Sequence, residues 1–117
     1  MKHELKLQSK YFEYIKEGTK RIELRLYDKK RKNICIGDTI IFYKEPELND
    51  KINTKVIGLL RYNNFVDLFN DFDIDILADN SISKNELLNT LEEFYPKEKQ
   101  NNYGVIGIRI ELMNDIK

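Results

Sequence analysis

Apolar and polar residues alternate along several short segments of the chain, which is the pattern of β-strands that bury one face. In residues 20–27, the apolar Ile22, Leu24 and Leu26 alternate with charged and aromatic residues. Alternation or a β-rich composition also marks residues 2–7, 39–43, 53–62 and 103–112. The pattern therefore predicts roughly five or six strands.

Apolar residues at helical spacing mark two other segments. Residues 9–17 begin at Ser9, an expected N-cap, and end before Gly18, which suits the left-handed position after a helix. Ser83 followed three residues later by Glu86 is a capping-box sequence that opens a second helix. The expected buried stripe of this helix consists of Leu87, Leu88, Leu91, Phe94 and Tyr95.

The segments between these elements indicate how the strands are joined. Residues 65–69 suit one or two helical turns, residues 71–80 are acidic and irregular, and residues 97–102 form a polar loop. Because few strands are separated by a helix of crossover length, we expect a mixed or antiparallel, curved sheet. Closing such a sheet removes its exposed edges. The prediction is a single α+β domain over residues 1–117, a small mixed β-barrel with roughly two or three helices packed outside.

The charge balance limits the ligands that the chain can bind. Twenty basic and 20 acidic residues give a formal net charge of zero. Long nucleic acids bound by bulk electrostatics need an excess of basic charge, so they are not expected, whereas a nucleotide or a short single strand in a local site is compatible. The only basic run, residues 29–32, follows the 20–27 strand and is either a solvated turn or a guide for a phosphate backbone.

The content of metal-binding residues is low. One cysteine and one histidine exclude an internal disulfide and a zinc site built from several such residues. The acidic segment lacks the glycine and closing glutamate of a calcium loop, so neither a metal nor a cofactor is expected. No apolar run approaches the ~20 residues of a membrane span, and the first residues lack the apolar part of a secretory signal. We therefore expect a cytoplasmic protein without membrane contact.

The polar face of the 20–27 strand is the strongest candidate site. It carries Arg21, Glu23, Arg25 and Tyr27 in a row. A strand holds such side chains at fixed spacing, which a loop does not. Arg25 offers a planar fork for a phosphate, a carboxylate or a base edge, and its structural alternative is an ion pair with Glu23.

The motif Gly18-x-Lys20-x-x-Glu23-x-Arg25, with Gly37-Asp38 before an apolar strand, resembles the ASCH domain (ASC-1 homology) of the PUA-like superfamily. The order and spacing agree over nearly the whole chain. The later matching segments are Leu60-Arg61-Tyr62, residues 65–69, Phe94-Tyr95-Pro96 and Tyr103-Gly104-Val105-Ile106.

The resemblance implies a PUA-like barrel with a cleft lined by the motif strand, and a role in binding RNA or a modified nucleoside. One group of the family hydrolyses the amide of N4-acetylcytidine, and some members are reported as ribonucleases. The amidohydrolase group has a Lys at the position of Lys20, a Thr at that of Glu23 and a catalytic Glu before the last helix. This chain keeps Lys20, replaces the Thr by Glu23 and offers only Asp79 and Asn80 near the third position.

Two sets of candidate site residues result. Lys20 and Glu23 are the catalytic pair if the protein is an enzyme, and a structural ion pair is the alternative. Tyr95 continues the apolar helical stripe and is expected in the core. The candidate ligand-binding residues are Arg25, Tyr27, Arg61, Tyr62 and Tyr103, and the tyrosines at 27 and 103 are suited to stack on a base.

Three functions are compatible with these residues. The first is a cleft that binds RNA or a nucleoside through Arg25. The second is a metal-independent hydrolase in which Lys20 activates water and Glu23 transfers the proton. The third is a protein-interaction module that uses residues 67–79 and 97–102, with a cleft that tolerates mutation.

Overall fold

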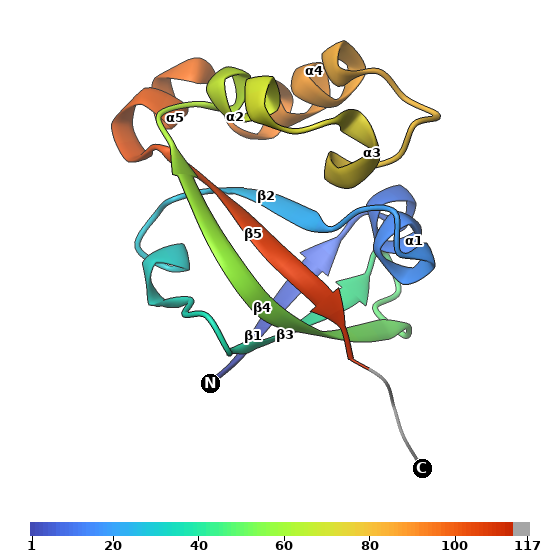
Figure 1. Cartoon of the computed structure of the whole chain (residues 1–117). Coiled ribbons are helices and arrows are strands. Elements are labelled where there is room, and N and C mark those ends of the chain that lie inside the picture. Colours follow the sequence, from blue (N-terminus) through green and yellow to red (C-terminus); the bar gives the residue numbers. More distant parts are fainter. Residues whose placement is uncertain (114–117) are drawn as a thin grey trace.

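One curled β-sheet forms the framework of the protein in the computed structural model, which describes residues 1–113 (Figure 1). The strand order is β1-β3-β4-β5-β2. The strands are β1 (Lys2–Leu7), β2 (Ile22–Leu26), β3 (Thr39–Lys44), β4 (Lys51–Tyr62) and β5 (Val105–Leu112). The pair β1–β3 is parallel and the other three pairs are antiparallel, which confirms the predicted mixed sheet.

The sheet curls into a half-barrel because β4 and β5 are long and irregularly paired. Their register shifts between Val56 and Gly58, and such a bulge bends a strand. Both run diagonally across the molecule in Figure 1. β1 and β2 remain as the two edge strands, and the Arg25 Nη2 of β2 donates a hydrogen bond of 2.9 Å to the Lys6 carbonyl of β1. One side chain therefore bridges the open seam of the barrel.

The helices are more numerous than predicted. Residues 1–113 contain α1 (Ser9–Glu17), α2 (Phe65–Asp71), α3 (Ile74–Leu77), α4 (Lys84–Phe94), α5 (Lys97–Tyr103) and a 3-10 turn, η1 (Arg31–Asn33). Helices α2 to α5 form a layer over β2, and α1 lies beside it (Figure 1). None of the helices in this part of the chain is long and apolar enough to cross a membrane.

Helix α5 occupies a segment that was predicted as a loop, and Tyr103 ends this helix instead of starting the last strand. The buried side chain of Gln100 explains the difference. Its Oε1 accepts a hydrogen bond of 3.0 Å from the Phe65 amide, and its Nε2 donates one of 2.8 Å to the Tyr95 carbonyl. Tertiary contacts of one polar residue thus hold a helix that has almost no apolar face.

The helix ends follow the predicted caps with one exception. The Ser83 hydroxyl accepts a hydrogen bond of 3.1 Å from the Glu86 amide, as the capping box predicts. Gly18 adopts the left-handed conformation, with φ of 88°. Ser9 was expected to cap α1, but it is the first helical residue and Gln8 occupies the cap position.

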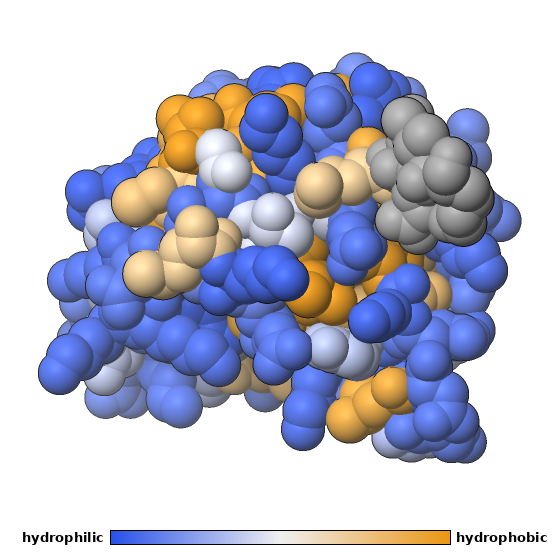
Figure 2. Space-filling view, turned by 90° about the horizontal axis from the view of Figure 1, so that it is seen from below, coloured by the Kyte–Doolittle hydropathy of each residue, from blue (hydrophilic) through white to orange (hydrophobic). Residues whose placement is uncertain are grey.

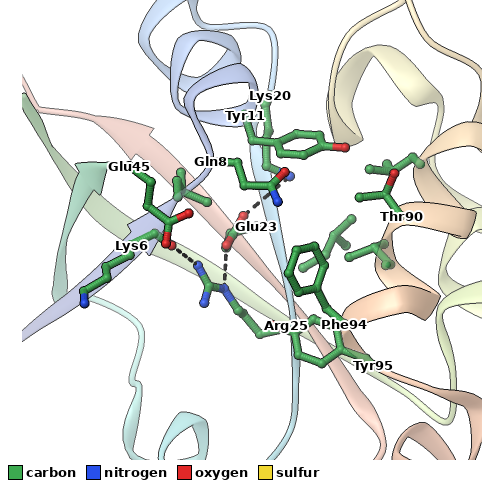
Figure 3. A pocket seen from close by; sticks show the side chains of 14 residues that line it. Lys6, Gln8, Tyr11, Lys20, Glu23, Arg25, Glu45, Thr90, Phe94 and Tyr95 are labelled. Atoms are coloured by element: carbon green, nitrogen blue, oxygen red, sulfur yellow. Dashed lines mark hydrogen bonds and ion pairs between the residues drawn. The ribbon is translucent and has the colours of Figure 1, made fainter. Parts of the chain in front are cut away.

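Both faces of β2 are covered, which determines where the candidate site lies. The apolar Ile22, Leu24 and Leu26 pack against the helical layer together with Phe65 and Leu68. The opposite face, which carries Glu23 and Arg25, turns towards the seam between β1 and β2 (Figure 3). A second core fills the half-barrel and includes Phe12, Ile40, Phe42, Ile106 and Ile108.

The face opposite the helical layer is largely hydrophilic, with hydrophobic residues in small patches (Figure 2). This agrees with the charged content of 34%. The α+β class and the small curled sheet are thus confirmed, whereas the number of helices was underestimated.

Candidate functional site

A cavity of about 200 Å³ opens between the edge strands β1 and β2 (Figure 3). The end of β1 contributes Lys6 and Leu7, and the first turns of α1 contribute Tyr11. One wall belongs to α4 and includes Thr90 and Phe94. We call this cavity the seam pocket.

Three charged residues of the motif lie together at the floor of the seam pocket (Figure 3). The Arg25 Nε donates a hydrogen bond of 2.6 Å to Glu23 Oε2. The Lys20 Nζ lies 3.6 Å from Glu23 Oε1 on the other side of the carboxylate. The side chains of Lys20 and Glu23 are only 3% and 5% exposed, so two cations share one carboxylate in a nearly dry environment.

The ammonium group of Lys20 is already surrounded by acceptors. Its Nζ donates hydrogen bonds of 2.7 Å to the carbonyls of Ile22 and Leu77, in addition to the contact with Glu23. Burial lowers the pKa of Lys20, and the Glu23 carboxylate opposes this effect. Because an ammonium has three donors, this arrangement occupies Lys20 and leaves little capacity for contact with a ligand.

The ionisation of Glu23 and Arg25 is maintained by their mutual contact. Burial alone would raise the pKa of Glu23, but Arg25 and Lys20 lower it below the usual value. Burial would lower the pKa of Arg25, but the carboxylate of Glu23 and the Tyr95 hydroxyl raise it. The Glu23–Arg25 pair at the floor of the seam pocket therefore stays charged at neutral pH.

Aromatic side chains rim the seam pocket. Tyr11, Phe94 and Tyr95 line it, and Phe94 is 54% exposed. Phe94 was expected in the buried stripe of α4, but it ends that helix and lies at the mouth of the pocket. Tyr95 is half-buried, and its ring packs 6.0 Å from Phe65. The expectation that it belongs to the core therefore holds in part, because it also lines the pocket.

The other predicted ligand-binding residues do not line the seam pocket. Tyr27, Arg61, Tyr62 and Tyr103 line a separate, wider groove of about 770 Å³. The sequence suggested one cleft, whereas the structure divides these residues between two sites. The reason is that Tyr27 follows the end of β2, and the chain turns there towards η1.

Other polar residues considered from the sequence have structural roles. The Asp79 carboxylate accepts a hydrogen bond of 3.0 Å from the Ser81 amide, and Asp79 and Asn80 do not line the seam pocket. In the basic run, Arg31 forms an ion pair of 3.0 Å with Asp28. Residues 1–113 contain no group of three or more His, Cys, Asp or Glu side chains that could hold a metal ion.

Comparisons with known proteins support the resemblance read from the motif. The family model described as "ASCH domain" matches residues 5–114. The crystal structure of the hypothetical protein PH0355 is similar, with a TM-score of 0.85 and 39% sequence identity over 97% of this chain and 100% of that chain. The solution NMR structure of PF0455 from Pyrococcus furiosus has a TM-score of 0.77 and 33% identity over 97% and 99% of the two chains. The comparison with curated proteins found no match.

Proposed function

The chain belongs to the ASCH domain family, and we propose that it binds RNA or a modified nucleoside, with one base held in the seam pocket. The observation that carries this proposal is the buried pair of Arg25 and Glu23 at the floor of a cavity rimmed by aromatic side chains. Domains of this family are associated with RNA binding, which agrees with this site.

The floor of the pocket has the chemistry that reads the edge of a base. A guanidinium donates to carbonyl oxygens and ring nitrogens, and a carboxylate accepts from an exocyclic amino group. Both side chains are held in place before a ligand arrives, Arg25 by the Lys6 carbonyl and Glu23 by Arg25 and Lys20. Such preorganisation reduces the ordering cost of binding.

The size and the rim of the pocket suit one planar ring. Its volume of about 200 Å³ is below the roughly 300–1,000 Å³ of pockets that hold drug-sized ligands. Phe94 presents a half-exposed ring at the mouth, and stacking on such a ring contributes about 1–3 kcal/mol per base. A single base extruded from a strand, or a free nucleoside, therefore matches the space.

The hydrolase alternative has less support from the geometry. A general base needs a free acceptor site, but the three donors of Lys20 face two carbonyls and Glu23. Asp79, the residue nearest in sequence to the third catalytic position, does not line the pocket. The interaction-module alternative predicts that changes in the seam pocket have no effect on ligand binding.

The test is binding of fluorescein-labelled RNA hexamers of adenylate, cytidylate and uridylate, measured by anisotropy. Phe94→Ala should weaken the tightest of these complexes about 5- to 150-fold, which is the loss of one stacked base. Ile36→Ala is a matched control, because Ile36 is 66% exposed and does not line the pocket.

Arg25→Lys completes the test, because it keeps the charge and removes the fork. This variant should bind the labelled hexamers more weakly. Free cytidine and N4-acetylcytidine, which should displace the hexamers from the wild type, should no longer displace them from the variant. Equal affinity of the Phe94, Arg25 and Ile36 variants would show that the seam pocket does not hold the base.

A further inference from the structure

A second, wider groove lies at the far end of α5 from the seam pocket. Tyr95, just before α5, lines the pocket, whereas Tyr103, at the end of α5, lines the wider groove. We call this the Tyr27 groove and define it by Tyr27, Arg61, Asp67 and Tyr103. The seven residues of α5 span about 10 Å. Arg25 of the seam pocket and Tyr27 of the groove are two residues apart at the end of β2, which corresponds to about 7 Å of extended chain.

Tyr27 acts as a platform for a cation. The Arg61 guanidinium carbon lies 4.0 Å from the centroid of the Tyr27 ring, and the Lys32 Nζ lies 5.6 Å from it. Stacking uses the flat face of the guanidinium and leaves its N–H edge for other partners. No carboxylate in residues 1–113 forms an ion pair with Arg61. Arg61 is thus an exposed, oriented cation with unused donors.

Tyr103 provides a free aromatic surface in the same groove. It is 52% exposed, and the residue after it, Gly104, has φ of 74°. The Gly104 carbonyl accepts a hydrogen bond of 3.0 Å from the Tyr27 amide, and a Cβ at Gly104 would lie 3.2 Å from the Tyr62 carbonyl. The glycine therefore allows close contact between two backbone segments and fixes Tyr103 near the Arg61–Tyr27 pair.

We infer that the Tyr27 groove binds a second nucleotide of a single-stranded RNA, with Arg61 on a phosphate and Tyr103 stacked on a base. This inference rests on the proposed function, since it assumes that another base of the same strand occupies the seam pocket. A span of about 7–10 Å corresponds to about two or three nucleotides at the stacked spacing of roughly 3.4 Å, and to fewer in an extended strand.

The acidic residue in the groove allows a second test, in which a substitution should strengthen RNA binding instead of weakening it. Asp67 is exposed and lines the same groove as Arg61. Its carboxylate repels a phosphate, so Asp67→Asn should tighten RNA binding. A substitution that improves affinity cannot be explained by damage to the fold.

The experiment measures the affinity of the full chain for the three labelled hexamers at several salt concentrations. Arg61→Gln should reduce the slope of log Kd against log salt by about 0.7, which is the value of one phosphate contact in a single strand. Tyr103→Ala should weaken binding about 5- to 150-fold without changing that slope. Arg109→Gln is the matched control, because Arg109 also lies over an aromatic ring, 5.9 Å from that of Phe72, but outside the groove.

The outcomes separate this inference from the proposed function. If Arg61→Gln behaves like Arg109→Gln and Tyr103→Ala binds within twofold of the wild type, the groove is not a nucleotide site. In that case, free cytidine that displaces the hexamer from the wild type and the Arg61 variant, but not from the Phe94 variant, would assign the binding to the seam pocket alone. If instead the groove variants weaken binding and the Phe94 variant does not, the seam pocket proposal is wrong and the groove binds RNA by itself.

Discussion

Replacement of Glu23 by Gln should destabilise the protein strongly, because it leaves two buried cations without their shared carboxylate. Glu23 is the partner of Arg25 at 2.6 Å and of Lys20 at 3.6 Å. Removal of one member of a buried ion pair costs about 3–5 kcal/mol of stability. Lys20 keeps two carbonyl acceptors and Arg25 keeps the Lys6 carbonyl. We therefore expect the lower end of this range, about 3 kcal/mol.

Urea unfolding followed by circular dichroism measures this loss. With a slope of about 1.5 kcal/mol/M, the midpoint should fall by about 2 M, and the melting temperature should fall by about 10 °C. Glu13→Gln is the control, because Glu13 forms an equally short ion pair of 2.6 Å with Lys44, and both side chains are partly open to solvent, with 39% and 28% of their surface exposed. Its effect should be far smaller, since solvent screens such pairs.

The pH dependence distinguishes loss of the charge from loss of packing. The pKa of Glu23 is lowered in the folded state, so its contribution is present above the ordinary value of 4.5 and is lost as the pH falls through the lowered value. The Gln variant should lack this part of the acid sensitivity. A midpoint for Glu23→Gln within about 0.7 M of the wild type, which is about 1 kcal/mol, would refute the claim that the carboxylate holds the buried cations.

Three further predictions concern the termini of elements and the chemistry of the pocket. A hydrogen bond from His3 and one from the Cys35 amide lower the pKa of Asp38 to about 2, so wild-type stability should fall between pH 4 and pH 2. Asp38→Asn should flatten a plot of melting temperature against pH in that interval, and an unchanged slope would contradict this assignment. Ser83→Ala should cost about 1 kcal/mol in urea unfolding, because it removes the cap of α4, and an unchanged midpoint would show that the cap is dispensable. N4-acetylcytidine incubated with the protein should not be converted to cytidine, as measured by chromatography, since the donors of Lys20 are occupied. Conversion that disappears in Lys20→Ala would instead support a hydrolase.

The alternation in β2 made much of the site predictable from the sequence. The apolar Ile22, Leu24 and Leu26 enter the core. Glu23 and Arg25, which alternate with them, meet in the seam pocket. This inference needs only the period of two along one strand. The family motif supplied Lys20, which lies outside the strand and reaches the same carboxylate.

The remainder of the site depends on tertiary geometry. The separation of Tyr27 and Arg61 from Arg25 follows from the curl of the sheet and from the turn after β2, which no local pattern encodes. Phe94 has the spacing of the buried Leu87 and Leu91, but at the last residue of α4 it lines the open seam pocket and is half-exposed. Helix α5 was missed because it is held by the buried Gln100, and a lone glutamine in a polar segment gives no periodic signal.

The most direct test of the account is an NMR titration of the 15N-labelled protein with the tightest-binding RNA hexamer and with free cytidine. We predict that both ligands shift the amide signals of Glu23 to Arg25 and of the last turn of α4, because these segments line the seam pocket. Only the hexamer should also shift the signals around Arg61 and Tyr103. Saturable binding that leaves the signals of β2 and α4 unchanged would contradict the central claim that the seam pocket holds a base.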